Sequence, residues 1–292
     1  MKKAVCVLVA LLFLIAAAGC TPTPAAPSIE PPAVTEPAVV EPTVAPEPEP
    51  VPEPVELVVF AAASMTETMT AVAELYKAVA PEVTLVYNFD SSGTLKTQIQ
   101  EGADCDLFIS AAQKQMNELD SSKDAETNPD GLDFVLQGSR INLLENKVAL
   151  VVPEGNAANI NAFADIANCK SIALGNDDVP VGQYSNEILT NLDLMAGLEK
   201  GKKISFGSNV KEVTTQVSEG AVDCGIVYAT DAFSAGLTVV DLATKDMCRQ
   251  VIYPAAVLNI SKNPEAAQAF LDYLLTDEAM AVFANVGFAP AA

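Results

Sequence analysis

Residues 57–100 read LVVFAAASMTETMTAVAELYKAVAPEVTLVYNFDSSGTLKTQIQ and contain two successive strand-and-helix signals. The apolar runs Leu57–Phe60 and Val83–Tyr87 have the length of buried strands. Each run is followed by a segment with apolar residues at three- and four-residue intervals, Ser64–Ala80 and Ser92–Gln100, which predicts a helix. Strands that alternate with helices in this order predict an α/β fold.

The same alternation continues towards the C-terminus. We expect further strands in the apolar runs 106–109, 147–152, 171–174, 204–206 and 224–228, and helices around 188–195 and 210–217. Two closing helices follow Asn263-Pro264, where proline takes the first helical position. The runs 146–152 and 251–258 stand at the two ends of a second α/β unit, so we expect the chain to cross between two lobes there and to hinge at the crossings.

The first 20 residues have the layout of a secretory signal peptide, with Lys2 and Lys3 before an apolar run and Gly19-Cys20 after it. The run is too short to span a membrane, which takes about 20 apolar residues. Small residues directly before a cysteine resemble the lipobox of bacterial lipoproteins, which implies that Cys20 carries a lipid anchor. A plain signal peptide cleaved elsewhere is the alternative, and in both cases the protein leaves the cytoplasm.

Residues 21–54 contain 12 of the 19 prolines and no basic residue. Such a segment can neither form helices nor bury a core, so we expect a disordered, extended stalk. A recognition role for its proline motifs is the alternative.

The chain is strongly acidic. Its formal net charge is −22, and loss of Lys2 and Lys3 with the signal peptide makes it −24. This balance argues against nucleic acid and against an anionic membrane surface as partners. An anionic ligand would have to be held by local dipoles rather than by the overall field.

Several kinds of catalytic and binding site are excluded by missing residues. There is no histidine, so Ser-His-Asp and Cys-His nucleophiles and histidine zinc sites are absent from the sequence. No glycine-rich nucleotide-binding motif occurs either. The pair Asp177-Asp178 is expected in a solvated loop. Cys105, Cys169, Cys224 and Cys248 lack C-x-x-C spacing, and they allow either disulfides or buried thiols.

Two small-residue turns with hydroxyl groups come directly after predicted strands, at 60–64 and at 89–94. Each leads into a helix, whose first N–H groups are unpaired and carry the positive end of the helix dipole, so each turn can hold an anion. For either serine alone, Ser64 or Ser92, a simple helix cap is the alternative, with Ser64 and Glu67 as a capping box. Two such turns in succession favour a ligand at the carboxyl ends of the strands.

The chain from Glu56 to its C-terminus resembles the molybdate-binding proteins of ABC transporters. The matching motifs occur in family order: VVFAAAS at 58–64, SSGTL at 91–95, GADCDLFISA at 102–111, GNDDVPVGQY at 175–184, Asn209-Val210, GIVYATDA at 225–232 and Gly287-Phe288.

The resemblance implies a two-lobed α/β fold of the type II periplasmic-binding-protein class, with mixed sheets flanked by helices and a ligand cleft between the lobes. Lobe 1 would comprise residues 55–143 and 255–292, and lobe 2 residues 144–254. The family's ligand contacts would fall on the hydroxyls of Ser64 and Ser92, the backbone N–H groups of Val181 and Val210, and the Tyr228 hydroxyl.

The function implied by the resemblance is capture of molybdate, and of tungstate with it, for an ABC importer. The protein would not be an enzyme and would bind no cofactor and no metal other than the oxyanion. It would be a monomer, anchored to the cell membrane by its lipid, and would interact with ABC permease subunits. The alternatives are a binding protein for phosphate or sulfate, and a surface sensor lipoprotein without a transport role.

Three departures from the family pattern bear on the site. Val181 stands where relatives often have alanine, which a backbone contact tolerates. Gly93 replaces a common serine, with little expected effect. Asp90 would repel a dianion if it faced the ligand, or would accept a proton from hydrogenphosphate; its alternative role is to complement the charge of the helix start.

Overall fold

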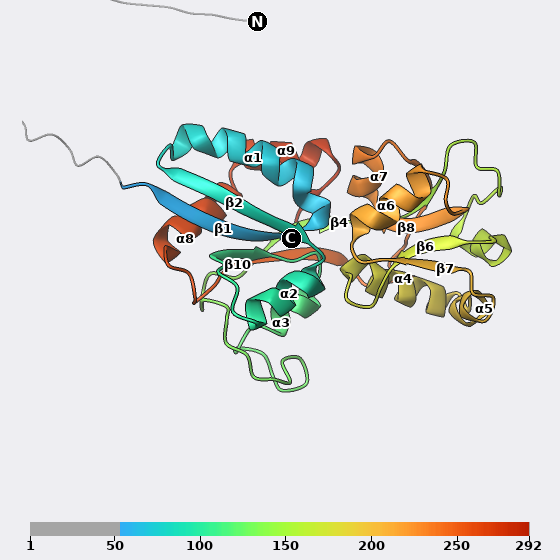
Figure 1. The fold of residues 1–292 in the computed structure, drawn as a ribbon, viewed down its shortest axis with the longest axis horizontal. Coiled ribbons are helices and arrows are strands. Elements are labelled where there is room, and N and C mark those ends of the chain that lie inside the picture. The colour runs from blue at the N-terminus through green and yellow to red at the C-terminus, as the bar shows by residue number, and fades with distance from the viewer. Residues whose placement is uncertain (1–52, 292) are drawn as a thin grey trace, which may run out of the picture. The chain divides into compact units, whose positions relative to one another are not determined.

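The computed structural model describes residues 53–291, and the expected signal peptide, Cys20 and nearly all of the stalk lie outside this range. The described chain contains two mixed β-sheets flanked by helices, which is a two-lobed α/β fold (Figure 1). The six-stranded sheet has the order β11-β4-β10-β3-β1-β2. Its strands are β1 (Val55–Ala62), β2 (Val83–Asp90), β3 (Leu107–Ile109), β4 (Ile141–Asn146), β10 (Val251–Val257) and β11 (Ala289–Pro290).

Helices cover both faces of the six-stranded sheet (Figure 1). On one face, α1 (Thr66–Val79), α8 (Pro264–Tyr273) and α9 (Asp277–Asn285) pack on the alternate residues Leu57, Val59 and Ala61. On the other face, α2 (Ser92–Gln100) and α3 (Gln113–Asn117) pack on Phe60 and Phe108. The closing helices α8 and α9 therefore return to the first lobe, as expected.

The five-stranded sheet has the order β7-β6-β8-β5-β9. Its strands are β5 (Val148–Val152), β6 (Ile172–Gly175), β7 (Ile204–Gly207), β8 (Cys224–Tyr228) and β9 (Thr238–Leu242). The helices of this lobe are α4 (Pro180–Asn191), α5 (Met195–Lys200), α6 (Val210–Ser218) and α7 (Ala229–Ser234). A 3-10 helix, η2 (Phe163–Asn168), precedes β6. Because β6, β7 and β8 are parallel, their carboxyl ends all face the same edge of the sheet.

The chain crosses between the sheets twice, once at Lys147 between β4 and β5 and once through residues 243–250 between β9 and β10. Residues 144–146 and 251–254 belong to the six-stranded sheet of lobe 1, where β4 pairs with β10, and not to lobe 2 as predicted. The reason for the shift is that the antiparallel pairing of β4 with β10 extends to Asn146 and Val251, past a change of register between Tyr253 and Pro254. The rest of the division, with 55–143 and 255–292 in lobe 1 and the part of 144–254 between the crossings in lobe 2, stays a proposal.

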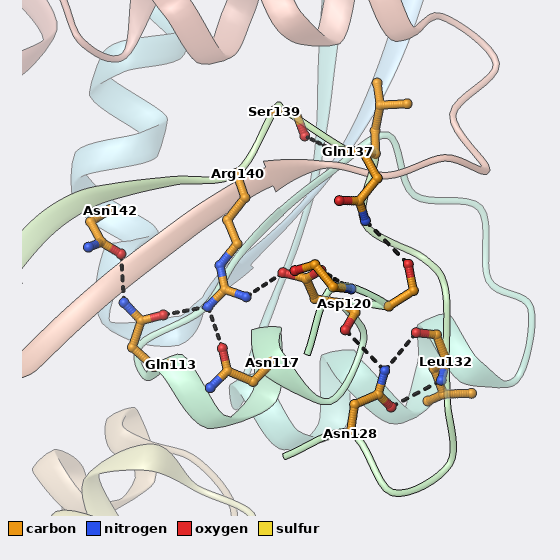
Figure 2. A network of polar contacts seen from close by, with 12 residues as sticks. Gln113, Asn117, Asp120, Asn128, Leu132, Gln137, Ser139, Arg140 and Asn142 are labelled. Carbon is orange, nitrogen blue, oxygen red and sulfur yellow. Dashed lines mark hydrogen bonds and ion pairs between the residues drawn. The ribbon is translucent and has the colours of Figure 1, made fainter. Parts of the chain in front are cut away.

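A long segment between α3 and β4 is held to lobe 1 by Arg140 (Figure 2). The Arg140 guanidinium donates to Asp120 Oδ2 and to Gln113 Oε1, both at 2.6 Å, and to Asn117. Asn128 closes the other end of the segment with hydrogen bonds to Asp120 O and Leu132 O. Besides these side-chain contacts, an isolated antiparallel bridge between Val135 and Leu258 attaches the segment to the end of β10.

The sequence pattern located most elements within a few residues, but it did not predict β4, β9, β11, α3, α5, α7, η1 (Ala63–Met65) or η2. Within residues 53–291 the four cysteines are buried free thiols. No helix among these residues has the length and apolar character needed to cross a bilayer. The same part of the chain holds no cluster of three acidic or cysteine side chains suited to a metal ion.

Candidate functional site

The first expected site residue, Ser64, lies in a single turn of 3-10 helix, η1 (Ala63–Met65), between β1 and α1. Its side chain does not cap the helix. The Ser64 hydroxyl is 2.8 Å from the Tyr253 hydroxyl, and the residue is 5% exposed. The capping box of Ser64 and Glu67 is therefore wrong, because the inserted turn carries Ser64 away from the start of α1.

Ser92 is the first residue of α2, and the helix cap is its neighbour Ser91, whose hydroxyl accepts from the Thr94 N–H at 3.1 Å. The alternative role of Ser92 as a cap is thus also wrong. Instead, the fully buried Ser92 hydroxyl accepts a hydrogen bond from the Ala111 N–H at 2.9 Å. Since its oxygen is used as an acceptor there, its proton is free to be donated elsewhere.

Lobe 2 contributes two helix N-termini. Val181 is the second residue of α4, behind Pro180, and Val210 is the first residue of α6, behind the cap Asn209. Amides in the first turn of a helix have no acceptor within that helix and lie at the positive end of its dipole. Both positions follow the carboxyl end of a strand, β6 and β7 respectively. They are buried backbone donors on the edge of lobe 2.

Tyr228 ends β8 and is 1% exposed. Its hydroxyl reaches the Ala111 carbonyl of lobe 1 at 3.5 Å, which is long for a hydroxyl donor. Burial raises the pKa of Tyr228 well above its ordinary value, so the group stays protonated. Tyr228 therefore keeps a proton that a closer acceptor can take.

These five residues surround one small cavity. Its wall includes Ser64, Ser92, Val181, Val210 and Tyr228, with Ala62, Ala63, Asp90, Ser91, Ala111, Val179 and Pro180. The cavity volume is about 10 Å³, whereas two open hollows elsewhere measure about 440 and 600 Å³. The larger hollows contain none of the five residues, and we take the small cavity as the site because donors from both lobes converge on it.

Asp90 also borders the cavity, but its carboxylate is engaged with protein donors. Its Oδ1 accepts from the Ser91 N–H at 2.7 Å and from the Asn209 amide at 3.3 Å. The first contact fits the expected role at the start of α2. The second contact joins the end of β2 to Asn209, the cap of α6, so Asp90 also connects the two lobes.

Gly93 of α2 lies close to the backbone of Asp178 in lobe 2. A Cβ atom at this position would lie 2.2 Å from the Asp178 carbonyl oxygen and 2.9 Å from its carbon. Asp178 belongs to the loop before α4, where Asp177 and Asp178 are exposed, as expected. Our expectation that the replacement of serine by Gly93 has little effect is therefore wrong, since this arrangement of the lobes has no room for a side chain.

An ion-pair network connects the two lobes near the cavity. Lys211 of α6 donates to the Glu67 carboxylate of α1 at 2.8 and 2.9 Å and lies 3.1 Å from Asp231 Oδ1. Asp231 is 1% exposed, and beyond this ion pair its oxygens have no hydrogen-bond partner. Burial raises the pKa of Asp231 to about 6, although the nearby Lys211 charge lowers it.

Sequence reasoning missed the polar partners that hold the site. Asn209, Asp178, Ala111 and Tyr253 all contact expected site residues or their neighbours across long sequence distances. Only Asn209 had a local signal, because an asparagine before an apolar helical segment is a common helix cap.

Comparison with known proteins agrees with this geometry. Residues 57–289 match the model of the bacterial extracellular solute-binding proteins. The molybdate-binding protein ModA of Haemophilus influenzae is 32% identical over 80% of this chain and 89% of its own length. YvgL of Bacillus subtilis, named as an ABC transporter substrate-binding lipoprotein, is 34% identical over 80% of this chain and 86% of its own length.

A solved structure from Clostridium difficile, named as the substrate-binding domain of a molybdenum ABC transporter, is 35% identical with a TM-score of 0.61. The match covers 82% of this chain and all of that one. This chain, with its two sheets and a cavity of donors between them, belongs to the family of bacterial extracellular solute-binding proteins.

Proposed function

We propose that the protein captures molybdate outside the cytoplasm and delivers it to an ABC importer. The observation that carries this proposal is the lining of the cavity, where uncharged donors from both lobes face one small space. The solute-binding family and the molybdate-binding names of its relatives support the same ligand. A receptor that delivers its ligand unchanged needs no catalytic group, and none is proposed.

The chemistry of the ligand fits this lining. Near neutral pH molybdate is a dianion without a proton, so it only accepts hydrogen bonds. Hydroxyls and first-turn amides only need to donate, and they avoid the cost of burying a compensating charge. The ligand contacts we propose are the hydroxyls of Ser64, Ser92 and Tyr228 and the N–H groups of Val181 and Val210. Tungstate, of nearly the same size and charge, should bind comparably.

The test is a calorimetric titration of the folded region with molybdate, tungstate, sulfate and phosphate. We expect tight binding of the first two only. Ligand at a hundredfold excess over its dissociation constant should also raise the free energy of unfolding by about 2.7 kcal/mol. Binding of phosphate or sulfate in preference to molybdate, or no binding of any of the four, would overturn the proposal.

The matched variants are Ser92→Ala and Ser218→Ala. Ser92 lines the cavity, whereas Ser218 is an exposed serine at the end of α6. Loss of a hydrogen bond to a charged ligand costs about 1.5–3 kcal/mol, so Ser92→Ala should weaken binding by roughly 10- to 150-fold. Ser218→Ala should bind as the wild type does. Equal affinities for the two variants would contradict the assigned contact.

The membrane arrangement is part of the proposal. We propose that Cys20 carries a lipid anchor, that residues 21–54 form a stalk, and that the binding protein works as a monomer with permease subunits. The lipoprotein name of the Bacillus subtilis relative supports the anchor. Mass spectrometry of the protein from its membrane tests it, because a lipid on Cys20 and removal of residues 1–19 change the mass, and substitution Cys20→Ala should release the protein.

A further inference from the structure

A buried chain of hydrogen bonds runs from the cavity to the first crossing between the lobes. The Ser64 hydroxyl is 2.8 Å from the Tyr253 hydroxyl. Asn146 Nδ2 donates to the Tyr253 hydroxyl at 3.2 Å and to Thr230 Oγ1 at 2.9 Å. All four residues are at most 7% exposed. The chain thus joins Ser64 and Tyr253 of lobe 1 to Thr230 of lobe 2 through Asn146, the last residue of β4.

The direction of the Asn146 amide is fixed by a backbone contact. Its Oδ1 accepts from the Lys147 N–H at 2.8 Å, and Lys147 is the crossing residue itself. With the oxygen used there, the NH₂ group faces Tyr253 and Thr230. An amide NH₂ group can only donate, so the Tyr253 hydroxyl oxygen has to accept.

One arrangement of the remaining protons gives the proton of the buried Tyr253 hydroxyl an acceptor. The Tyr253 oxygen accepts from Asn146, so its own proton is available for Ser64, the other hydroxyl in contact with it. The Ser64 oxygen accepts that proton, which leaves the Ser64 proton free for the cavity that Ser64 borders. The Tyr253 ring is held between Tyr228 and Phe288, with centroids 5.8 and 5.2 Å away, so its hydroxyl is fixed in place.

We propose that Asn146 and Tyr253 are positioning residues that orient the Ser64 hydroxyl as a donor, and so make the cavity specific for an oxyanion without a proton. This inference rests on the proposed function, because it concerns the same ligand. The Ser92 hydroxyl is also oriented as a donor, because its oxygen accepts a hydrogen bond from the Ala111 N–H. The ligand thus meets serines whose acceptor sides are already occupied.

The inference predicts that reversing the direction of these hydrogen bonds lowers the affinity for molybdate more than removing one of them does. In Asn146→Asp the NH₂ donor becomes a carboxylate oxygen, so Tyr253 donates to it and Ser64 has to donate to Tyr253. The Ser64 lone pairs then face the cavity and repel the oxyanion. Tyr253→Phe only removes the partner and frees the Ser64 hydroxyl to rotate. We expect affinity for molybdate to fall about tenfold in Tyr253→Phe and at least a hundredfold in Asn146→Asp.

The added charge in Asn146→Asp is controlled by a double-mutant cycle with Ser64→Ala, because coupling between the two sites isolates the effect carried by Ser64. The fold-loss of molybdate affinity caused by Asn146→Asp should be at least about ten times smaller with alanine at position 64 than with serine there. Tyr273→Phe is the matched control for Tyr253→Phe, since the Tyr273 hydroxyl bonds Glu278 on α9, away from the cavity. It should bind molybdate as the wild type does.

All variants are titrated with molybdate after a thermal unfolding scan has established that they are folded. If Asn146→Asp costs the same factor with serine and with alanine at 64, or if Tyr253→Phe and Asn146→Asp both bind as the wild type does, the inference is wrong while the proposed function stands. If the wild type and Tyr273→Phe fail to bind molybdate, the proposed function fails and the inference fails with it.

Discussion

Substitution Gly93→Ala should weaken molybdate binding without weakening the unliganded fold. In the structure a Cβ at Gly93 lies 2.2 Å from the Asp178 carbonyl oxygen, and ordinary contact begins near 3.4 Å. The lobes therefore have to separate by roughly 1 Å at this point. Overpacking of this kind costs about 1–3 kcal/mol. Because we expect the lobes to hinge open without ligand, this cost should fall only on the closed arrangement.

The expected loss of affinity is about 5- to 150-fold, as follows from about 1.4 kcal/mol for each factor of ten. The open, unliganded protein should be as stable as the wild type or slightly more stable, because alanine favours a helix over glycine by about 0.5–1 kcal/mol. The assay is a calorimetric titration with molybdate beside a thermal unfolding scan without ligand.

Gly197→Ala is the control, since Gly197 also lies in a helix, α5, and a Cβ there meets nothing within 4 Å. This variant should bind molybdate as the wild type does. The reasoning is refuted if Gly93→Ala binds within a factor of two of the wild type, because the ligand-bound lobes then do not come together at Gly93 and Asp178.

Two further predictions concern the network of Lys211, Glu67 and Asp231. Removal of a partner from a buried ion pair costs about 3–5 kcal/mol, so Lys211→Met should lower the free energy of unfolding by about this amount at pH 8. The loss should be smaller at pH 5, where Asp231 is protonated. Equal losses at both pH values would contradict this prediction. The folded state raises the pKa of Asp231 from 3.8 to about 6, so it binds this proton more tightly than the unfolded chain does, and stability falls as pH rises from about 4 to about 6. The free energy of unfolding of Asp231→Asn should therefore rise relative to that of the wild type by up to about 3 kcal/mol as the pH increases across that window. Urea unfolding at several pH values checks this, and a difference that stays constant with pH would disprove it.

Much of the fold was predictable because its signals are local. The strand-to-helix turns at Ser64 and Ser92 are recognisable in the sequence as apolar runs followed by small residues. Helix α2 begins and ends at the predicted residues. The crossing at Lys147 was misplaced by a few residues because the polar run Glu145-Asn146-Lys147 interrupts the apolar pattern without showing to which sheet each neighbouring strand belongs.

The supporting contacts of the site were not predictable for the opposite reason. Tyr253 is 189 residues from Ser64, and the pattern of a buried strand gives no sign that a tyrosine hydroxyl there meets a serine. Whether Ser91 or Ser92 caps α2 depends on one residue of register, and the choice decides which hydroxyl serves the cavity. The cost of a side chain at Gly93 depends on a loop of the other lobe, which the local sequence does not encode.

The absence of cationic side chains from the cavity wall also has a kinetic consequence. A lining without cations gives a dianion no attraction at long range, while the protein as a whole carries a formal net charge of −22. Added salt shortens the Debye length to about 8 Å at physiological ionic strength and so weakens this repulsion. Encounter with the oxyanion should therefore speed up as salt is added, which is the reverse of the behaviour of receptors that steer anions with lysine and arginine.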